Sequence, residues 1–159
     1  MRSVRNRSKG GRTVRALAGS HSGYGEKLAL LQASFIGDTA QSIAEYCNEM
    51  HRRRGDAHGG SWTYGTPRGW SPSGQWEVRV WSQVQSDPLP FDPNMLLRMA
   101  YETDGGVRVL LTLGGRVLLS KTYGRDSSAG LIAADGAVAY ERALLEAGAA
   151  LKNRAGRRR

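Results

Sequence analysis

The strongest constraint on the fold is a pair of adjacent glycines, Gly114 and Gly115, placed between two apolar stretches. The stretch before them is VRVLLTL (107–113), and the stretch after them is RVLLSKTY (116–123). Tight hairpin turns need positive φ angles, which glycine adopts without steric cost. The sequence therefore predicts an antiparallel β-hairpin over residues 107–123.

Two further strands are predicted upstream of this hairpin. In QWEVRVWSQVQ (75–85), apolar residues occupy alternate positions, which is typical of a strand with one buried face. A proline-rich connection leads to MLLRMAYE (95–102), and the turn dipeptides Asp104-Gly105 and Gly105-Gly106 follow it. Together the four segments predict a four-stranded antiparallel meander.

A helix is predicted before the meander, from about Glu26 to about Arg53. Gly37-Asp38 interrupts its apolar stripe, but the stripe keeps its phase across the interruption. We therefore expect one kinked helix rather than two. The apolar residues recur every three or four positions, as on one helix face: Leu28, Leu31, Phe35, Ile36, Ala40, Ile43, Cys47 and Met50.

A second helix is predicted after the meander. Asp126-Ser127-Ser128 offers side chains that can cap its start. Asp135-Gly136 is expected to separate a short turn from the main helix. The apolar stripe of this helix consists of Ala137, Tyr140, Leu144, Ala147 and Leu151.

The order helix, meander, helix predicts an α+β domain whose two helices cover one face of the sheet. We place this single domain at residues 25–151. A basic N-terminal arm over residues 1–24 and a basic C-terminal tail over residues 152–159 are expected to be flexible. Residues 55–74 contain Gly, Pro, Ser and Trp without any period, and are expected to form a long loop.

The net charge of +9 is concentrated at the two ends of the chain. Residues 1–15 carry six Lys and Arg side chains, residues 152–159 carry five, and neither segment contains an acid. Residues 16–151 hold 12 basic and 14 acidic side chains, so the folded body is close to neutral. The ends are expected to contact nucleic-acid phosphate or an acidic neighbouring subunit, or else to remain solvated. Their candidate contact residues are Arg2, Arg5, Arg7, Lys9, Arg12, Arg15, Arg154, Arg157, Arg158 and Arg159.

Catalytic and metal-binding patterns are sparse. His51, Asp56 and His58 are the only clustered candidate metal ligands, whereas a structural zinc site needs four ligands at short spacing. The single cysteine, Cys47, excludes an internal disulfide and is expected to be a small buried hydrophobe. No Gly-x-Ser-x-Gly elbow, P-loop or dinucleotide fingerprint occurs. We therefore predict no catalytic residue, metal, cofactor or small-molecule substrate.

The segment HRRRGDAHGGSWTYGTPRGW (51–70) combines an arginine cluster with aromatic residues. Tryptophan, tyrosine and arginine are enriched at interface hot spots, and they also stack on unpaired bases. We interpret the segment as a docking loop; the alternative is that one or two of its tryptophans close the core. The candidate contact residues are Arg52, Arg53, Arg54, Trp62, Tyr64 and Trp70, with Trp81 on the following strand as a further contact.

The segments GGRVLLSKTYGRDSSAG and AADGAVAYERALLEAG together resemble the last strand and helix of double-stranded-RNA-binding domains. The resemblance covers about a third of the chain, and the order of the elements agrees with that family. It implies an RNA-binding helix that opens with a lysine cluster. Residues 126–129 stand at the matching positions and contain no lysine, and residues 131–136 form an apparent insertion. Membership is therefore not inferred.

These observations predict a non-enzymatic structural subunit of a large assembly. The expected assembly is a bacteriophage particle, with a role of the head–tail connector or tail-completion type. Other subunits, in a homo-oligomer, are the expected partners, and DNA or RNA is an additional one through the basic arms. The alternative is a nucleic-acid-binding accessory protein. The expected location is the virion or the bacterial cytoplasm, since no signal peptide or membrane span is apparent.

Overall fold

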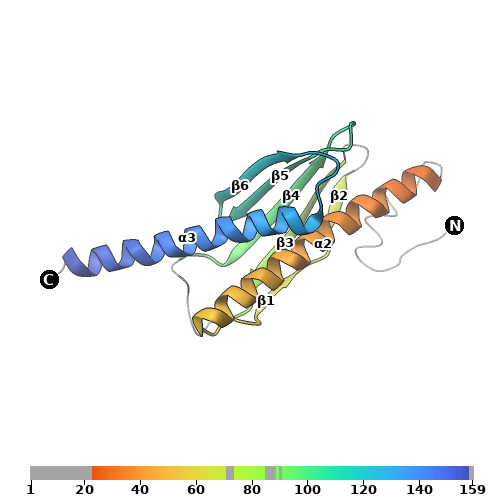
Figure 1. The fold of residues 1–159 in the computed structure, drawn as a ribbon. Coiled ribbons are helices and arrows are strands. Elements are labelled where there is room, and N and C mark those ends of the chain that lie inside the picture. Colours follow the sequence, from red (N-terminus) through yellow and green to blue (C-terminus); the bar gives the residue numbers. More distant parts are fainter. Residues whose placement is uncertain (1–22, 71–73, 85–88, 90, 158–159) are drawn as a thin grey trace.

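The computed structural model describes residues 23–70, 74–84, 89 and 91–157. Within them the chain forms an α+β fold with a helix at each end and a sheet between them, which confirms the predicted class and element order (Figure 1). The elements are α2 (Gly23–Arg54), β1 (Trp62–Tyr64), β2 (Arg68–Trp70), β3 (Gln75–Ser82), β4 (Asn94–Tyr101), β5 (Val107–Leu113), β6 (Arg116–Tyr123) and α3 (Ala129–Arg157).

The sheet is antiparallel throughout, in the order β1-β3-β4-β5-β6, with β2 also paired to β3. Strands β3 to β6 form the predicted meander, but the sheet has six strands and not the four that were predicted. Gly114 and Gly115 join β5 to β6 with φ angles of 55° and 86°, and Gly105 in the preceding turn has a φ of 93°. The positive φ angles expected of these turn glycines are therefore confirmed.

The prediction of a long loop over residues 55–74 is wrong for the part that forms β1 and β2. These strands have three residues each and pair with opposite halves of β3, Trp62 with Ser82 and Trp70 with Gln75. Three residues are too few to show the alternation of apolar and polar positions that marks a strand. These strands form because they pair with β3 further along the chain.

Helix α2 runs through Gly37-Asp38 without a break, which confirms the single helix. It ends at Arg54 in a Schellman motif, in which Gly55 has a φ of 75°. The Gly55 N–H donates to the Arg52 carbonyl (3.0 Å), and the Asp56 N–H donates to the His51 carbonyl (3.2 Å). The chain therefore reverses direction directly after the arginine cluster.

Helix α3 starts after Ser128, whose hydroxyl oxygen accepts a hydrogen bond from the Leu131 N–H (3.1 Å). The expected break at Asp135-Gly136 is wrong, because the helix is continuous there. Gly136 instead permits close packing, since a Cβ at this position would lie 3.1 Å from Leu111 Cδ2. The helix also continues to Arg157, so the expected flexible tail is helical as far as that residue.

Both helices cover one face of the sheet, and they also pack against each other (Figure 1). The core between the layers is built from alternate strand residues, such as Val78, Leu97 and Leu111, and from the stripe of α2 that includes Ile43 and the fully buried Cys47. None of the described elements covers the opposite face, which we call the open face. The basic residues 1–22 and Arg158 and Arg159 lie outside the described residues.

Candidate functional site

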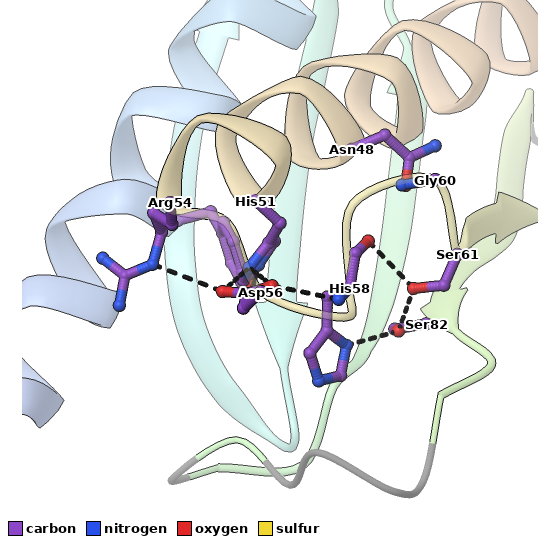
Figure 2. Close-up of polar contacts among 9 residues, drawn as sticks. Asn48, His51, Arg54, Asp56, His58, Gly60, Ser61 and Ser82 are labelled. Atoms are coloured by element: carbon purple, nitrogen blue, oxygen red, sulfur yellow. Dashed lines mark hydrogen bonds and ion pairs between the residues drawn. The ribbon is translucent and has the colours of Figure 1, made fainter.

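The segment that follows α2 is fixed by a buried chain of hydrogen bonds through His51, which we call the His51 network. His51 Nδ1 lies 3.0 and 2.9 Å from the two carboxylate oxygens of Asp56, and His51 Nε2 lies 2.7 Å from the Tyr140 hydroxyl (Figure 2 shows the Asp56 side). His51 and Tyr140 are fully buried. The network therefore ties the end of α2 to α3.

Burial and hydrogen bonding shift the pKa values of two groups in the network. Partial burial by itself would raise the pKa of Asp56, but hydrogen bonds from His51 and the His58 backbone, with the attraction of both histidines, hold that pKa below its usual range. Burial raises the pKa of Tyr140, so its hydroxyl keeps its proton. Both ring nitrogens of His51 therefore have a hydrogen-bond partner, Asp56 at Nδ1 and Tyr140 at Nε2.

His58 and Asn48 hold the rest of this turn. His58 Nδ1 lies 2.6 Å from the Ser82 hydroxyl, which in turn lies 2.8 Å from the Ser61 hydroxyl. Asn48 Oδ1 accepts hydrogen bonds from the backbone N–H groups of Gly60 (3.0 Å) and Trp62 (2.7 Å). Figure 2 shows these residues pointing toward one another across the turn.

The histidines thus serve as internal hydrogen-bonding groups. Across the described residues, no group of three or more His, Cys, Asp or Glu side chains is arranged to hold a metal ion. His51 and the Tyr140 hydroxyl lie in the core, whereas the Asp56 carboxylate at the other end of the network is partly exposed. What this arrangement can do is lock the end of α2 in place.

The aromatic residues of segment 51–70 do not share one surface. Trp62 is only 4% exposed and packs edge-on against Tyr140, so it closes the core and is not a surface anchor in this structure. This corrects its assignment as an interface residue. Tyr64 remains 41% exposed. Trp70 lies on β2, while nothing is described of its side chain. Segment 51–70 therefore buries His51, His58 and Trp62 and leaves Tyr64 on the surface.

The arginines of this segment stay on the surface. Arg52, Arg53 and Arg54 are exposed in the last turn of α2. Arg52 pairs with Glu49 (3.1 Å) and Arg54 with Asp56 (3.5 Å), so part of their charge is neutralised within the chain. Arg154 and Arg157 lie on the last turns of α3, where only the backbone is described.

The open face carries a groove that was not predicted. It has a volume of about 890 Å³, with Ala100 on β4 and Leu110 on β5 among its lining residues. Arg98, Arg108 and Glu77 also line it. In the sequence, Arg98 and Arg108 alternate with apolar residues, which indicates that one face of the sheet is polar. This alternation does not show whether another element covers the polar face.

Trp81 lies on β3, on the same face of the sheet as Glu77 and Arg79. It is half-buried, and the Arg79 guanidinium stacks over its ring at 4.8 Å from the ring centroid. Arg79 also donates to Asn94 Oδ1 (3.1 Å) and has no carboxylate partner among the described residues. Trp81 and Arg79 therefore remain available on the surface, as the prediction of a second contacted face requires.

Both helices leave large apolar side chains on the surface. At the start of α2, Leu28, Leu30 and Leu31 form what we call the leucine patch, in which Leu30 is 51% and Leu31 67% exposed. On α3 the exposed apolar residues Leu131, Val138 and Leu145 follow one another at intervals of seven positions. A seven-residue interval places them on one stripe of the helix.

The chain matches no family model, and no curated protein or solved structure is significantly similar to it. Neither α2 nor α3, over the part that the structure describes, is long and apolar enough to cross a lipid bilayer.

Proposed function

We propose that the protein is a non-enzymatic structural subunit that assembles with copies of itself. The observation that carries this proposal is one helical turn near the start of α2 that is apolar on all sides. Leu28, Ala29, Leu30 and Leu31 occupy four successive positions, which together face every side of a helix. Only Ala29 faces the core, and the leucines are exposed. A helix that is apolar on all sides is normally buried, so a partner is expected to cover it.

The stripe on α3 supports the same proposal. Leu131, Val138 and Leu145 lie opposite the buried residues Ile132, Tyr140 and Leu144 of the same helix. An apolar seam with a seven-residue period is typical of a surface on which another helix packs. Two long helices with apolar residues on their outer sides therefore give the protomer more contact surface than its own fold uses.

The assembly we propose is a bacteriophage particle, in a role of the head–tail connector or tail-completion type. The supporting features are the small α+β body, the basic segments at both ends of the sequence, and the apolar surfaces of the helices. Such subunits form rings whose arms contact neighbours or DNA. This proposal places the protein in the virion or, before assembly, in the cytoplasm of the bacterial host.

The test is the mass of the purified full-length protein by size-exclusion chromatography with light scattering, followed by negative-stain electron microscopy. We expect one discrete oligomer at micromolar concentration, with ring-shaped particles in the images. A protein that remains monomeric at about 50 μM would contradict self-assembly, since stable interfaces have dissociation constants well below this concentration.

The alternative function is nucleic-acid binding, and the arginines of the open face favour it. Arg79, Arg98 and Arg108 all lie on that face, where Glu77 pairs with Arg98 and Glu102 pairs with Arg108. If nucleic acid is the principal partner, the isolated protein should bind single- or double-stranded oligonucleotides with affinity that falls steeply with salt. Five engaged phosphates give a slope of about −4.5 on duplex DNA. A flat binding curve at about 50 mM salt would exclude this alternative.

A further inference from the structure

We propose that the leucine patch of one protomer docks into the open-face groove of the next protomer, so that subunits join head to tail. This inference rests on the proposed self-assembly and names the surfaces that make it. It concerns two features that the isolated fold leaves unused, an apolar helix start and an uncovered groove. The groove can cover the exposed leucines, and the helix can fill the groove.

The groove has the chemistry of a helix-binding surface. Leu110 and Ala100 give it apolar lining, and they alternate with charged residues, because Leu110 pairs with Arg98 and Ala100 pairs with Arg108 in the sheet register. Arg98 contacts Glu77 only at 3.5 Å, while Arg108 donates to Glu102 at 2.7 Å. The groove therefore offers apolar contacts at Leu110 and Ala100 and a guanidinium group directly beside each of them.

The arginines of the rim remain free to bind further carboxylates. The side chains of Arg98 and Arg108 are 57% and 63% exposed despite their ion pairs. A guanidinium has five N–H donors, so one contact with a glutamate leaves donors available. The groove therefore favours a helix that presents acidic groups beside its apolar residues.

The start of α2 has this composition. Leu30, Leu31 and Ser34 lie on its exposed side, with Glu26 before them and the exposed Asp38 after them. The thirteen residues from Glu26 to Asp38 span about 18 Å of helix. Lys27 is the only base in this stretch. The surface thus carries a carboxylate near each end and the exposed Lys27 on the same side, a net charge of −1 toward the groove arginines.

The contact cannot form within one protomer. Helix α2 lies on the covered face of the sheet and the groove on the opposite face, and Figure 1 shows the first turns of α2 extending past the edge of the sheet. A contact between two different surfaces of identical subunits leaves one of each free at the ends, so it continues until a ring closes or a filament forms. This geometry deepens the proposed function by specifying how the subunits are joined.

Cysteine cross-linking tests the pairing directly. Ser34→Cys labels the helix surface and Ser120→Cys labels the groove, and both serines are exposed. The natural Cys47 is fully buried, and burial raises the pKa of its thiol, so it does not compete for the reagent. With a short bis-maleimide, we expect a cross-linked dimer when the two single variants are mixed and allowed to exchange, and none with either variant alone.

The double variant with Ser34→Cys and Ser120→Cys should give a ladder of cross-linked species, whose largest member reports the number of subunits in a ring. Cross-linking of the Ser34→Cys variant with itself would show that the leucine patches meet each other, and would overturn the head-to-tail contact. An oligomer that gives no cross-link in the mixture would also overturn it. A wild-type protein that is monomeric would instead contradict the proposed function itself.

A pair of matched substitutions provides a second measurement. Leu31→Lys places a positive charge in the leucine patch, opposite the arginines of the groove, and should abolish the oligomer. Gln41→Lys puts the same side chain on an exposed site of the same helix and should leave the oligomer intact. Both variants should keep the wild-type thermal unfolding curve when they are compared as monomers at high dilution. Persistence of the oligomer in Leu31→Lys would overturn the inference.

Discussion

His51 makes hydrogen bonds to residues on two sides of it, and both of its ring nitrogens are committed. Its neighbours in the sequence gave no indication of this role, because Tyr140 is 89 positions away. The same is true of Trp62, whose burial depends on contact with Tyr140. Hydrogen-bond partners and burial at this distance are products of tertiary packing, and residue type alone could not show them.

Replacing Tyr140 with Phe should destabilise the protein by about 1–3 kcal/mol. The substitution keeps the ring but removes the hydroxyl, which leaves His51 Nε2 buried without its donor. The measurement is the urea midpoint of unfolding followed by circular dichroism. Tyr64→Phe removes a hydroxyl from a half-exposed ring and should change the midpoint little. Equal midpoints for the two variants would show that the His51 network does not contribute to stability.

Asp56 should make the stability of the protein depend on pH in the acid range. Its pKa in the folded state lies below the value of about 3.9 typical of unfolded chains. Its ionised form therefore stabilises the fold above about pH 3.9, and this stabilisation disappears as pH falls through the folded-state pKa. In Asp56→Asn, which cannot ionise, the loss of stability below about pH 4 should be smaller than in the wild type. Parallel stability curves for the two proteins would contradict this assignment.

At the scale of elements, the sequence predicted what depends on local pattern. The apolar spacing located α2 and α3, and the glycine pair located the β5–β6 hairpin. The continuity of α3 was missed because Asp135-Gly136 usually interrupts a helix, whereas here Gly136 is buried against Leu111 and Ile43. The open-face groove was missed because sequence periodicity shows which face of a strand is polar, but not whether another element covers that face.

Strand β2 depends on a close contact that only glycine permits. Gly69 pairs with Trp76 in the sheet, and a methyl group at Gly69 would overlap the buried Trp76 ring. Gly69→Ala should therefore destabilise the protein by about 1–3 kcal/mol through overpacking. Gly124→Ala is the matched control, since nothing lies within 4 Å of a Cβ there. Thermal unfolding of both variants tests this, and a wild-type melting temperature for Gly69→Ala would contradict it.

For the whole molecule, most of the net positive charge lies outside the segment that forms the hydrophobic core. The neutral body holds the described core, whereas residues 1–15 carry six of the basic side chains. Deletion of residues 1–15 lowers the net charge from +9 to +3 without removing any described element. It therefore tests whether these residues serve assembly. We expect unchanged thermal unfolding of the body and loss of incorporation into particles. Normal incorporation of the truncated protein would show that the basic arm is not required for assembly.

The hydrogen bond between His51 and Tyr140 also has a consequence for the order of folding. It joins the end of the first helix to a residue 89 positions later, so it can form only after most of the chain has been synthesised. Until α3 arrives, His51 lacks one partner and the apolar side of α2 lacks part of its cover. The turn that carries the arginine cluster is therefore completed late, when the C-terminal helix docks.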